Sequence, residues 1–245
     1  MRSFYHAGDV GDLVYGLYVM KVLGGGELLL GERTTLGQLQ PRVGIRRDMM
    51  LNLVGFLKSQ PYVNRVQWMA QPPFVTHDLN AFRKHWLGQL PGTGRDTHLL
   101  EMHCVAFGVP FHRDYAWLES AAQRKAGVVV ARSARQRNWR FPWREVVRKY
   151  KGNLVFVGTS AEYVEFMGSF GQVPRAETPT LEHLMKVIAG CDLFIGNSSA
   201  PLAVAEGLKK RVLQETSLET VERAHTRSMR ANAVDWYGGM ELPDV

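Results

Sequence analysis

Two Gly-Asp pairs, Gly8-Asp9 and Gly11-Asp12, lie close together in the segment FYHAGDVGDLVYGLYVMKVLGGGELLL, residues 4–30. A glycine turn that opens a helix can bind a phosphate through its backbone N–H groups, but a carboxylate in that turn would repel the phosphate. A carboxylate is useful there if a hydroxyl must lose its proton. The turn also fits a plain strand-to-helix connection with Asp12 as a helix-start residue.

A second loop of this kind is IGNSSAPLAV, residues 195–204, which again follows an apolar run and opens a helical pattern. Both loops can present N–H groups and the positive end of a helix to an anion. Neither is a complete nucleotide motif, because the chain has no G-x-x-x-x-G-K-[ST] and the first loop lacks the third glycine of a dinucleotide fingerprint.

The segment RSARQRNWRFPWREVVRKYKG, residues 132–152, is strongly basic and contains one acid, Glu145. Its basic residues are Arg132, Arg135, Arg137, Arg140, Arg144, Arg148, Lys149 and Lys151. Basic groups mixed with Trp139, Phe141 and Trp143 suit nucleic-acid backbones and unstacked bases. A solvated helix face with packed aromatics explains the helical part equally well, whereas the loop before it favours anion binding.

Short apolar runs alternate with helical patterns along the whole chain, which predicts an α/β fold with parallel sheets. We expect strands at 2–7, 26–32, 63–69, 127–133, 153–159, 192–198 and 211–216. We expect helices at 11–23, 47–60, 77–90, 96–109, 142–151, 160–171, 180–190 and 200–210, and a closing helix from about residue 219. The polar segment 119–127 is the best linker, so the predicted domains are 1–122 and 123–245, with a ligand cleft between the carboxyl ends of their sheets.

The composition of the 245 residues is that of an ordinary globular protein, with 45% hydrophobic and 22% charged residues. The net charge of +7 predicts an anionic partner such as a nucleotide diphosphate, a nucleic acid or a phospholipid surface. Cys104 and Cys191 lie in apolar segments without metal-site spacing, which predicts buried thiols. No apolar run is long enough to span a bilayer, and we expect a cytoplasmic protein.

Four segments, in order, resemble glycosyltransferase family 9, the ADP-heptose:lipopolysaccharide heptosyltransferases. They are GDVGDLVYGLYVMKVL, THLLEMHCVAFGV, NLVFVGTSAEY and TPTLEHLMKVIAGCDLFIGNSSAPLAVAEGLKKRVL. The resemblance implies a GT-B fold, in which two Rossmann-like domains face each other across a cleft. It also implies inverting transfer of a sugar from a nucleotide-diphosphate donor, with no metal and no other cofactor.

Carried over residue by residue, the resemblance makes Asp12 the general base. Asp9 is then expected to be a turn or helix-cap residue or a contact to a sugar hydroxyl on the acceptor side. His6, which precedes the glycine turn, is a candidate contact to a phosphate or to the acceptor. Arg137 or Arg140 matches the family's pyrophosphate contact. The remaining donor-binding candidates are Gly11, Gly158, Thr159, Asn197, Ser198, Ser199, Ala200 and Pro201. Ser198 replaces a family aspartate and Ala200 a glycine, so the donor of this chain is expected to differ or to bind more weakly.

The acceptor is the least defined part of this hypothesis. A phosphorylated glycolipid of the lipopolysaccharide type fits the family, and a modified DNA base, as used by phage enzymes, fits the basic segment. A different class of function is a non-catalytic nucleic-acid-binding protein on a GT-B-like shell, which Asp12 argues against. A dinucleotide oxidoreductase is disfavoured by the broken fingerprint.

Overall fold

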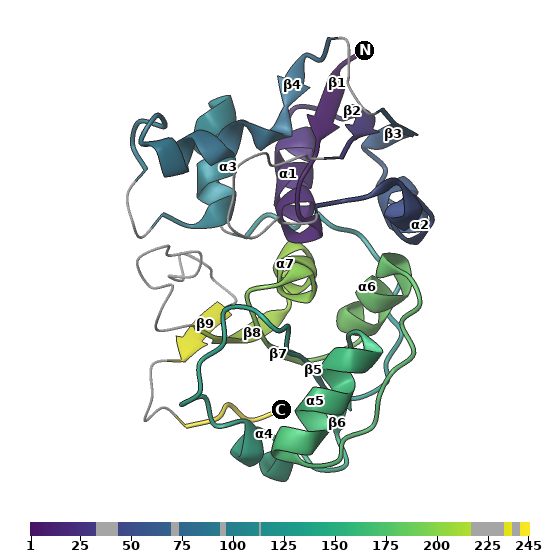
Figure 1. Ribbon diagram of the computed structural model, residues 1–245, viewed down its shortest axis with the longest axis vertical. Coiled ribbons are helices and arrows are strands. Elements are labelled where there is room, and N and C mark those ends of the chain that lie inside the picture. The colour runs from purple at the N-terminus through teal and green to yellow at the C-terminus, as the bar shows by residue number, and fades with distance from the viewer. Residues whose placement is uncertain (33–43, 70–73, 94–96, 113, 217–232, 237–240) are drawn as a thin grey trace.

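The computed structural model describes residues 1–32, 44–69, 74–93, 97–112, 114–216, 233–236 and 241–245. The described strands form two separate parallel sheets, one in each half of the chain, and helices pack around both (Figure 1). This arrangement confirms the predicted α/β class and the two-sheet, GT-B-like architecture.

The first sheet has the strand order β3-β2-β1-β4, and its neighbouring strands are parallel. The strands are β1 Ser3–His6, β2 Gly26–Leu30, β3 Val63–Trp68 and β4 His77–Asp78. Phe4, Leu28 and Leu30 have no exposed surface, as expected where a parallel sheet is covered on both faces. Because β1 and β4 are neighbours, the segments that follow them meet at one edge of the sheet.

The α-helices described in this half are α1 Val10–Val22, α2 Met50–Lys58 and α3 Leu99–Phe107. A short 3-10 helix, η1 Arg47–Met49, precedes α2. In α1 every residue from Leu13 to Met20 is buried, so the helix has no polar face. A helix that is apolar all round must be covered on all sides, and α1 is a central element of the molecule.

The predicted helix at 77–90 is wrong. The segment begins with the two-residue strand β4 and continues as a 3-10 helix, η2 Leu79–Leu87. The Asp78 carboxylate accepts hydrogen bonds from the backbone N–H of Asn80, 3.0 Å away, and from the Asn80 side chain. Such a local side-chain bond competes with α-helical bonding, which explains the tighter turn.

The second sheet has the order β6-β5-β7-β8-β9, again with parallel neighbours. Its strands are β5 Val128–Ala131, β6 Leu154–Phe156, β7 Leu193–Asn197, β8 Arg211–Glu215 and β9 Ala233–Trp236. Its helices are α4 Trp143–Lys149, α5 Ser160–Phe170, α6 Leu181–Ala189 and α7 Ala200–Gly207. Each of these except β9 was predicted.

The closing helix predicted from residue 219 falls largely on residues 217–232, which lie outside the described part. Residues 233–236 form strand β9 instead of helix. This strand pairs with β8 from Val212 to Glu215 and so covers an edge that would otherwise expose its backbone groups.

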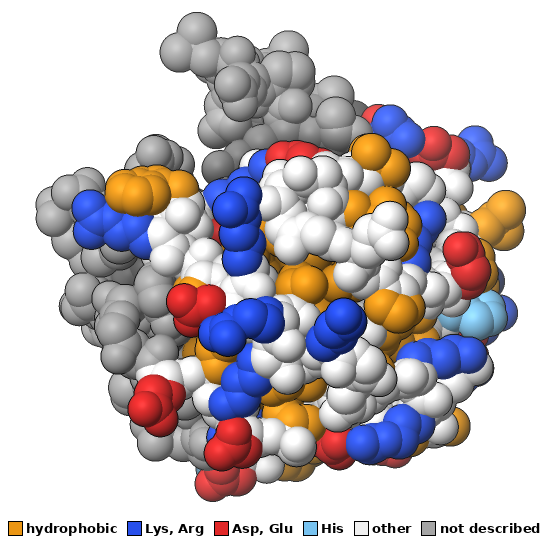
Figure 2. Space-filling model, turned by 90° about the horizontal axis from the view of Figure 1, so that it is seen from below, with side chains coloured by type: hydrophobic (Ala, Val, Ile, Leu, Met, Phe, Trp, Pro, Cys, Tyr) orange, Lys and Arg blue, Asp and Glu red, His pale blue; other side chains and the backbone are white. Residues whose placement is uncertain are grey.

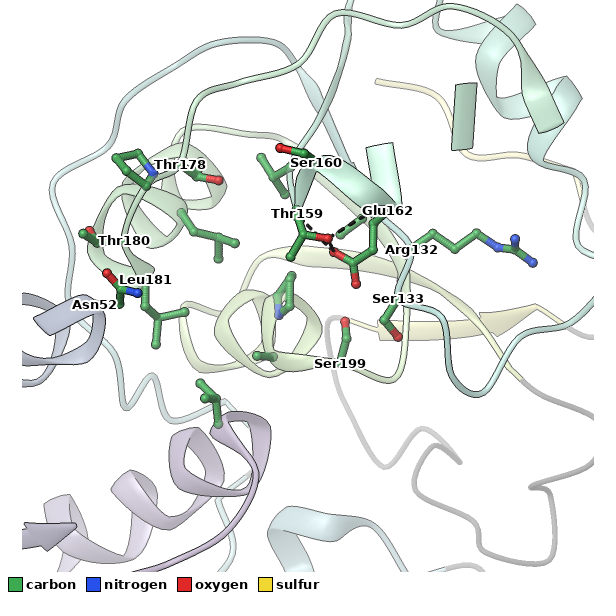
Figure 3. A pocket seen from close by; sticks show the side chains of 18 of the residues that line it. Asn52, Arg132, Ser133, Thr159, Ser160, Glu162, Thr178, Thr180, Leu181 and Ser199 are labelled. Atoms are coloured by element: carbon green, nitrogen blue, oxygen red, sulfur yellow. Dashed lines mark hydrogen bonds between the residues drawn. The ribbon is translucent and has the colours of Figure 1, made fainter. Parts of the chain in front are cut away.

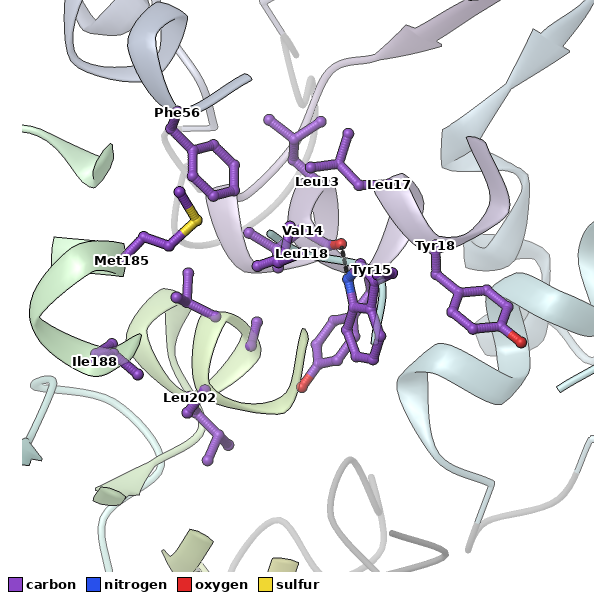
Figure 4. Close-up of a cluster of buried hydrophobic side chains, with 14 of the residues drawn as sticks. Leu13, Val14, Tyr15, Leu17, Tyr18, Phe56, Leu118, Met185, Ile188 and Leu202 are labelled. Carbon is purple, nitrogen blue, oxygen red and sulfur yellow. Dashed lines mark hydrogen bonds between the residues drawn. The ribbon is translucent and has the colours of Figure 1, made fainter. Parts of the chain in front are cut away.

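The two halves share one hydrophobic core (Figure 4). Leu13 and Leu17 of α1 lie in the same cluster as Leu202 of α7 and Met185 of α6. The Trp117 indole N–H donates to the Val14 carbonyl oxygen at 2.8 Å, while its backbone N–H donates to Gly207 in the other half. The chain segment between the sheets is therefore bonded to both halves, and the boundary at residues 122 and 123 stays a prediction.

Cys104 and Cys191 are buried free thiols, as predicted. Burial raises the pKa of Cys104 to about 12 and that of Cys191 to about 11. None of the described helices is long and apolar enough to cross a membrane.

Candidate active site

A cleft of about 640 Å³ lies where the carboxyl ends of β5, β6 and β7 face the start of α1 and the η1–α2 segment (Figure 3). Its lining comes from both halves of the chain. The lining residues are Val10, Met49, Asn52, Leu53, Ala131, Arg132, Ser133, Ala134, Arg135, Val157, Gly158, Thr159, Ser160, Glu162, Arg175, Thr178, Pro179, Thr180, Leu181, Leu184, Ser199, Ala200 and Pro201. Open α/β sheets bind ligands at this edge, so the cleft is where the sequence predicted it.

Five of the predicted donor-binding residues line the cleft. They are Gly158, Thr159, Ser199, Ala200 and Pro201. The other five, Gly11, Arg137, Arg140, Asn197 and Ser198, do not belong to its described lining. Gly11 lies close to this wall, because a side chain on it would meet Ala200 at 3.7 Å.

The start of α7 is open toward the cleft. Ser199 is the N-cap residue, and among the described contacts its hydroxyl makes no capping bond but donates to the Asn197 carbonyl at 2.9 Å. Pro201 lies in the first turn, where its missing N–H costs nothing. Figure 3 shows the Ser199 side chain directed into the cleft. The first N–H groups of α7 are thus available to an anion.

The start of α5 is closed by its own side chains. Thr159 accepts a hydrogen bond from the Glu162 N–H, and the Glu162 carboxylate accepts one from the Thr159 N–H at 2.9 Å, which forms a capping box. Gly158 has a φ of 144°, which a side chain would strain. Because Glu162 brings negative charge to this wall, α5 is a poorer anion site than α7.

Asn197 shapes the loop opposite instead of facing the cleft. Its side chain is buried, donates to the carbonyls of Ser133 and Arg135 at 3.0 and 2.6 Å, and accepts from the Ser133 N–H at 2.9 Å. These bonds use both N–H donors of the amide and one lone pair of its oxygen. Asn197 therefore holds the loop between β5 and α4, a role that the sequence did not indicate.

The arginines of this loop are not equivalent. Arg137 donates to the Ser133 carbonyl and forms a bidentate pair with Glu165, which lowers the pKa of Glu165. The Arg140 guanidinium lies over the exposed Trp139 ring, 4.7 Å from its centre. Both side chains are therefore turned to other partners. Arg132, Arg135 and Arg175 line the cleft. Arg132 and Arg135 belong to the basic segment 132–152, whereas Arg175 was not predicted from the sequence.

Asp12 lies in the first turn of α1, two residues after the cleft residue Val10. Its Oδ2 atom accepts a hydrogen bond from Arg83 Nη2 at 2.5 Å, and only 15% of the Asp12 side chain and 16% of the Arg83 side chain are exposed. This charge-assisted hydrogen bond pairs the Asp12 carboxylate with a positive charge and fixes its direction. Arg83 was not predicted from the sequence. It comes close to Asp12 because their segments follow the neighbouring strands β4 and β1.

Gly8 makes room for this pair, because a side chain on Gly8 would collide with Arg83 Nη2. His6 lies beneath the same turn, is fully buried, and has its Nε2 atom 3.3 Å from the Asp9 carbonyl oxygen. The His6 ring thus contacts the turn and has no surface open to a ligand. This burial does not support the predicted contact of His6 with a phosphate or the acceptor.

Asp9 occupies the N-cap position of α1, where a cap was expected, but its carboxylate makes no capping bond among the described residues. Its Oδ2 atom lies 3.5 Å from Arg135 Nη1. No group of three or more His, Cys, Asp or Glu side chains that could hold a metal ion is found in the part of the chain that the structure describes.

No protein-family model and no curated protein sequence matches this chain. Solved structures do. The E. coli heptosyltransferase WaaC with ADP-2-deoxy-2-fluoro heptose matches 96% of this chain and 93% of its own, with a TM-score of 0.56 and 13% identity. A glycosyl transferase family 9 protein from Veillonella parvula matches 96% of this chain and 84% of its own, with a TM-score of 0.60 and 11% identity.

A third similar structure is the dodecameric iron-containing heptosyltransferase TibC in complex with ADP-D-beta-D-heptose. It matches 97% of this chain and 63% of its own, with a TM-score of 0.56 and 14% identity. The chain therefore has the fold of the family 9 heptosyltransferases, as the resemblance in its sequence implied.

Proposed function

We propose that this chain is a glycosyltransferase that binds a nucleoside-diphosphate sugar in the cleft and transfers the sugar to an acceptor hydroxyl. The observation that carries the proposal is the open start of α7, where Ser199 lines the cleft. The opposite wall of the cleft includes Val10, the first residue of the helix that holds Asp12. The similar structures of WaaC and TibC contain ADP-heptose or its fluoro analogue, which supports a nucleotide sugar as the donor class.

In the proposed reaction the acceptor oxygen attacks the anomeric carbon, and the bond from that carbon to the diphosphate oxygen breaks. Asp12 takes the proton from the acceptor hydroxyl. The leaving diphosphate carries the negative charge, which the α7 N–H groups and the Arg135 guanidinium stabilise. Attack from the face opposite the leaving group gives inversion. Positive charge from the protein takes the place of a metal ion in this scheme.

The two ends of the cleft suit different parts of the donor. Part of the lining is apolar and comes from both halves: Val10, Met49 and Leu53 from the first half, and Leu181 and Leu184 from α6. This region fits a nucleoside base, and the polar wall at Ser133 and Ser199 fits the phosphates.

The test of this proposal is a thermal-shift screen of ADP, UDP and GDP and of their sugar conjugates, with EDTA and with Mg²⁺. A ligand that binds only the folded state raises the melting temperature with its concentration. We expect one nucleotide type to stabilise the protein equally with EDTA and with Mg²⁺. No shift with any nucleotide at millimolar concentration contradicts the donor site, and a shift that requires Mg²⁺ contradicts the metal-independent mechanism.

The acceptor in this proposal is anionic, because the chain carries a net charge of +7. A phosphorylated glycolipid and a modified DNA base are the two acceptors that we consider. Trp139 is 79% exposed, and the Arg140 guanidinium lies over one face of its ring. This pair favours the DNA base, since an aromatic ring and a guanidinium can stack on an unpaired base.

The same pair supports a second candidate function, non-catalytic nucleic-acid binding. Figure 2 shows Lys and Arg side chains spread over the face of the molecule that is seen from below in Figure 1. Arg144, Arg148 and Lys151 are exposed beyond Arg140 along the chain. This function is supported if the protein binds single-stranded DNA, if the binding weakens steeply with salt, and if Trp139→Ala and Arg140→Ala abolish it. If nucleotide binding survives both substitutions, Trp139 and Arg140 belong to the acceptor site, and the donor site stays in the cleft.

A further inference from the structure

One ion contact joins the two halves of the chain at the cleft. It runs from Asp9 Oδ2, at the N-cap of α1, to Arg135 Nη1, in the loop between β5 and α4, over 3.5 Å. Arg135 lines the cleft, and its side chain is 63% exposed. At this distance and exposure the pair is weak, since exposed pairs of this kind contribute about 0 to 1 kcal/mol.

Arg135 differs from the other two arginines that line the cleft. The Arg132 guanidinium donates to the buried carboxylate of Glu215 at 2.9 Å, and Figure 3 shows it directed away from the other labelled residues. The Arg175 guanidinium donates to the Gly158 carbonyl at 3.0 Å and to the Ser160 hydroxyl at 3.1 Å. Within the described residues, the Arg135 guanidinium has no hydrogen bond and only the contact with Asp9.

The backbone of Arg135 is fixed although its side chain is not. Its carbonyl accepts a hydrogen bond from the buried Asn197 amide at 2.6 Å. The next residue, Gln136, has a φ of 54°, a left-handed conformation that few residues other than glycine adopt. The loop therefore has a defined shape, and the Arg135 side chain can turn at the cleft wall while its backbone stays in place.

Asp9 is the natural competitor of a bound phosphate. Its carboxylate, 25% exposed, makes no capping bond to α1 among the described contacts and has Arg135 as its charged partner. A phosphate that enters the cleft offers Arg135 two oxygens in the geometry that a guanidinium prefers, which a single 3.5 Å contact does not match.

We infer that Asp9 and Arg135 form an exchangeable pair, in which Arg135 leaves Asp9 to bind the phosphates of the nucleotide. Asp9 then lowers the affinity for nucleotide, because its bond with Arg135 must break and its charge stays near the phosphates. This inference rests on the proposed function, since it assigns Arg135 to the phosphates of the proposed donor.

The test is a calorimetric titration of the whole chain with ADP and with inorganic pyrophosphate at low salt. Asp9→Asn should tighten binding about 3-fold, the size expected for a weak exposed pair. Arg135→Gln should weaken it about 10-fold or more. Asp9→Asn should gain less affinity in the Arg135→Gln background than in the wild type, because the bond between Asp9 and Arg135 is already absent there and only the charge of Asp9 is removed. In 0.5 M NaCl the gain of Asp9→Asn should shrink.

Asp192→Asn is the matched control. Asp192 also forms an exposed pair with an arginine, Arg124 at 2.5 Å, and neither residue belongs to the described lining of the cleft. This variant changes the net charge as Asp9→Asn does and should leave the affinity unchanged.

Unchanged or weaker binding in Asp9→Asn, with nucleotide bound by the wild type, overturns the exchange and leaves the proposed function standing. Weaker binding would mean that Asp9 contacts the ligand directly. If no variant, including Asp9→Asn, binds either probe, both the exchange and the donor site are wrong.

Discussion

Arg83 and Asp12, which are 71 residues apart in the chain, are joined by a hydrogen bond of 2.5 Å between Arg83 Nη2 and Asp12 Oδ2. The guanidinium also packs against the Phe82 ring at 4.9 Å, and Phe82 stacks on the buried His103 at 4.0 Å. The carboxylate that we propose as the base is therefore held from the side of η2 by a side chain that is itself packed in the core.

Removing Arg83 should destabilise the fold. Arg83→Met leaves Asp12 as a mostly buried charge without its guanidinium, and we expect the free energy of unfolding to fall by about 3 kcal/mol. Urea unfolding measures this loss. The double variant Arg83→Met/Asp12→Asn should recover part of the stability, since it removes both charges. A double variant that loses the sum of the two single effects contradicts a direct pair.

Asp12→Asn and Asp9→Asn should separate the two aspartates of the turn. The amide of Asp12→Asn keeps the shape of the side chain but cannot take the acceptor proton, so transfer should fall by roughly 10² to 10⁴ with donor affinity nearly constant. Asp9→Asn should slow transfer much less. Release of nucleoside diphosphate from the sugar nucleotide that the thermal screen selects measures both. Equal, small effects would leave the turn with a purely structural role.

Asn197→Ala should loosen the loop that carries Arg135. The change removes the partner of the Ser133 N–H and of two carbonyls, and we expect a loss of about 2 kcal/mol or more in unfolding free energy. Nucleotide affinity should fall as well, because the backbone of Arg135 is no longer held in place. Asn52→Ala is the control, since Asn52 also lines the cleft but is exposed. Equal losses in both variants contradict a role for Asn197 in holding the loop.

Stability should fall in mild acid because of His103. This ring is fully buried, and burial, together with the charges of His6, Arg83 and His98, lowers its pKa well below the usual 6.5. The unfolded chain therefore binds a proton near pH 6 that the folded chain does not bind. Below about pH 6.5, the free energy of unfolding should therefore fall by up to about 1.4 kcal/mol for each pH unit because of this residue.

His103→Phe should reduce that slope in urea unfolding measured from pH 7.5 to pH 5.5. His112→Gln, which removes an exposed imidazole, is the matched control and should leave the slope as it is in the wild type. An unchanged slope in His103→Phe would mean that other groups cause the loss of stability in acid.

Much of the fold was predictable because strands and helices of this chain have clear apolar periods. The loop around Ser199 was also predictable, since a strand that ends in Gly-Asn-Ser-Ser and continues into Ala-Pro must open a helix at the sheet edge. The Arg83–Asp12 pair was not, because it depends on β4 being the neighbour of β1, and a two-residue strand leaves no period to detect.

The choice among the arginines of residues 132–140 also lay beyond the sequence. Whether a guanidinium faces a cleft depends on which acids lie near it, and Glu165 and Glu215 reach Arg137 and Arg132 from distant segments. Likewise, the burial of α1 from Leu13 to Met20 reflects its contact with α7 of the other half, which a helical period within residues 10–22 cannot report.

If the cleft is the nucleotide site, a large side chain that fills it must block the nucleotide, and calorimetric titration measures this loss. Thr178 lines the cleft, and Thr178→Trp places a large ring there, whereas Val164→Trp adds the same ring at a position on α5 that is 64% exposed. With the nucleoside diphosphate that stabilises the wild type most, we expect at least a 10-fold loss of affinity in Thr178→Trp and none in Val164→Trp. If Thr178→Trp melts as the wild type does and keeps the wild-type affinity, the nucleotide binds elsewhere and the cleft is not its site.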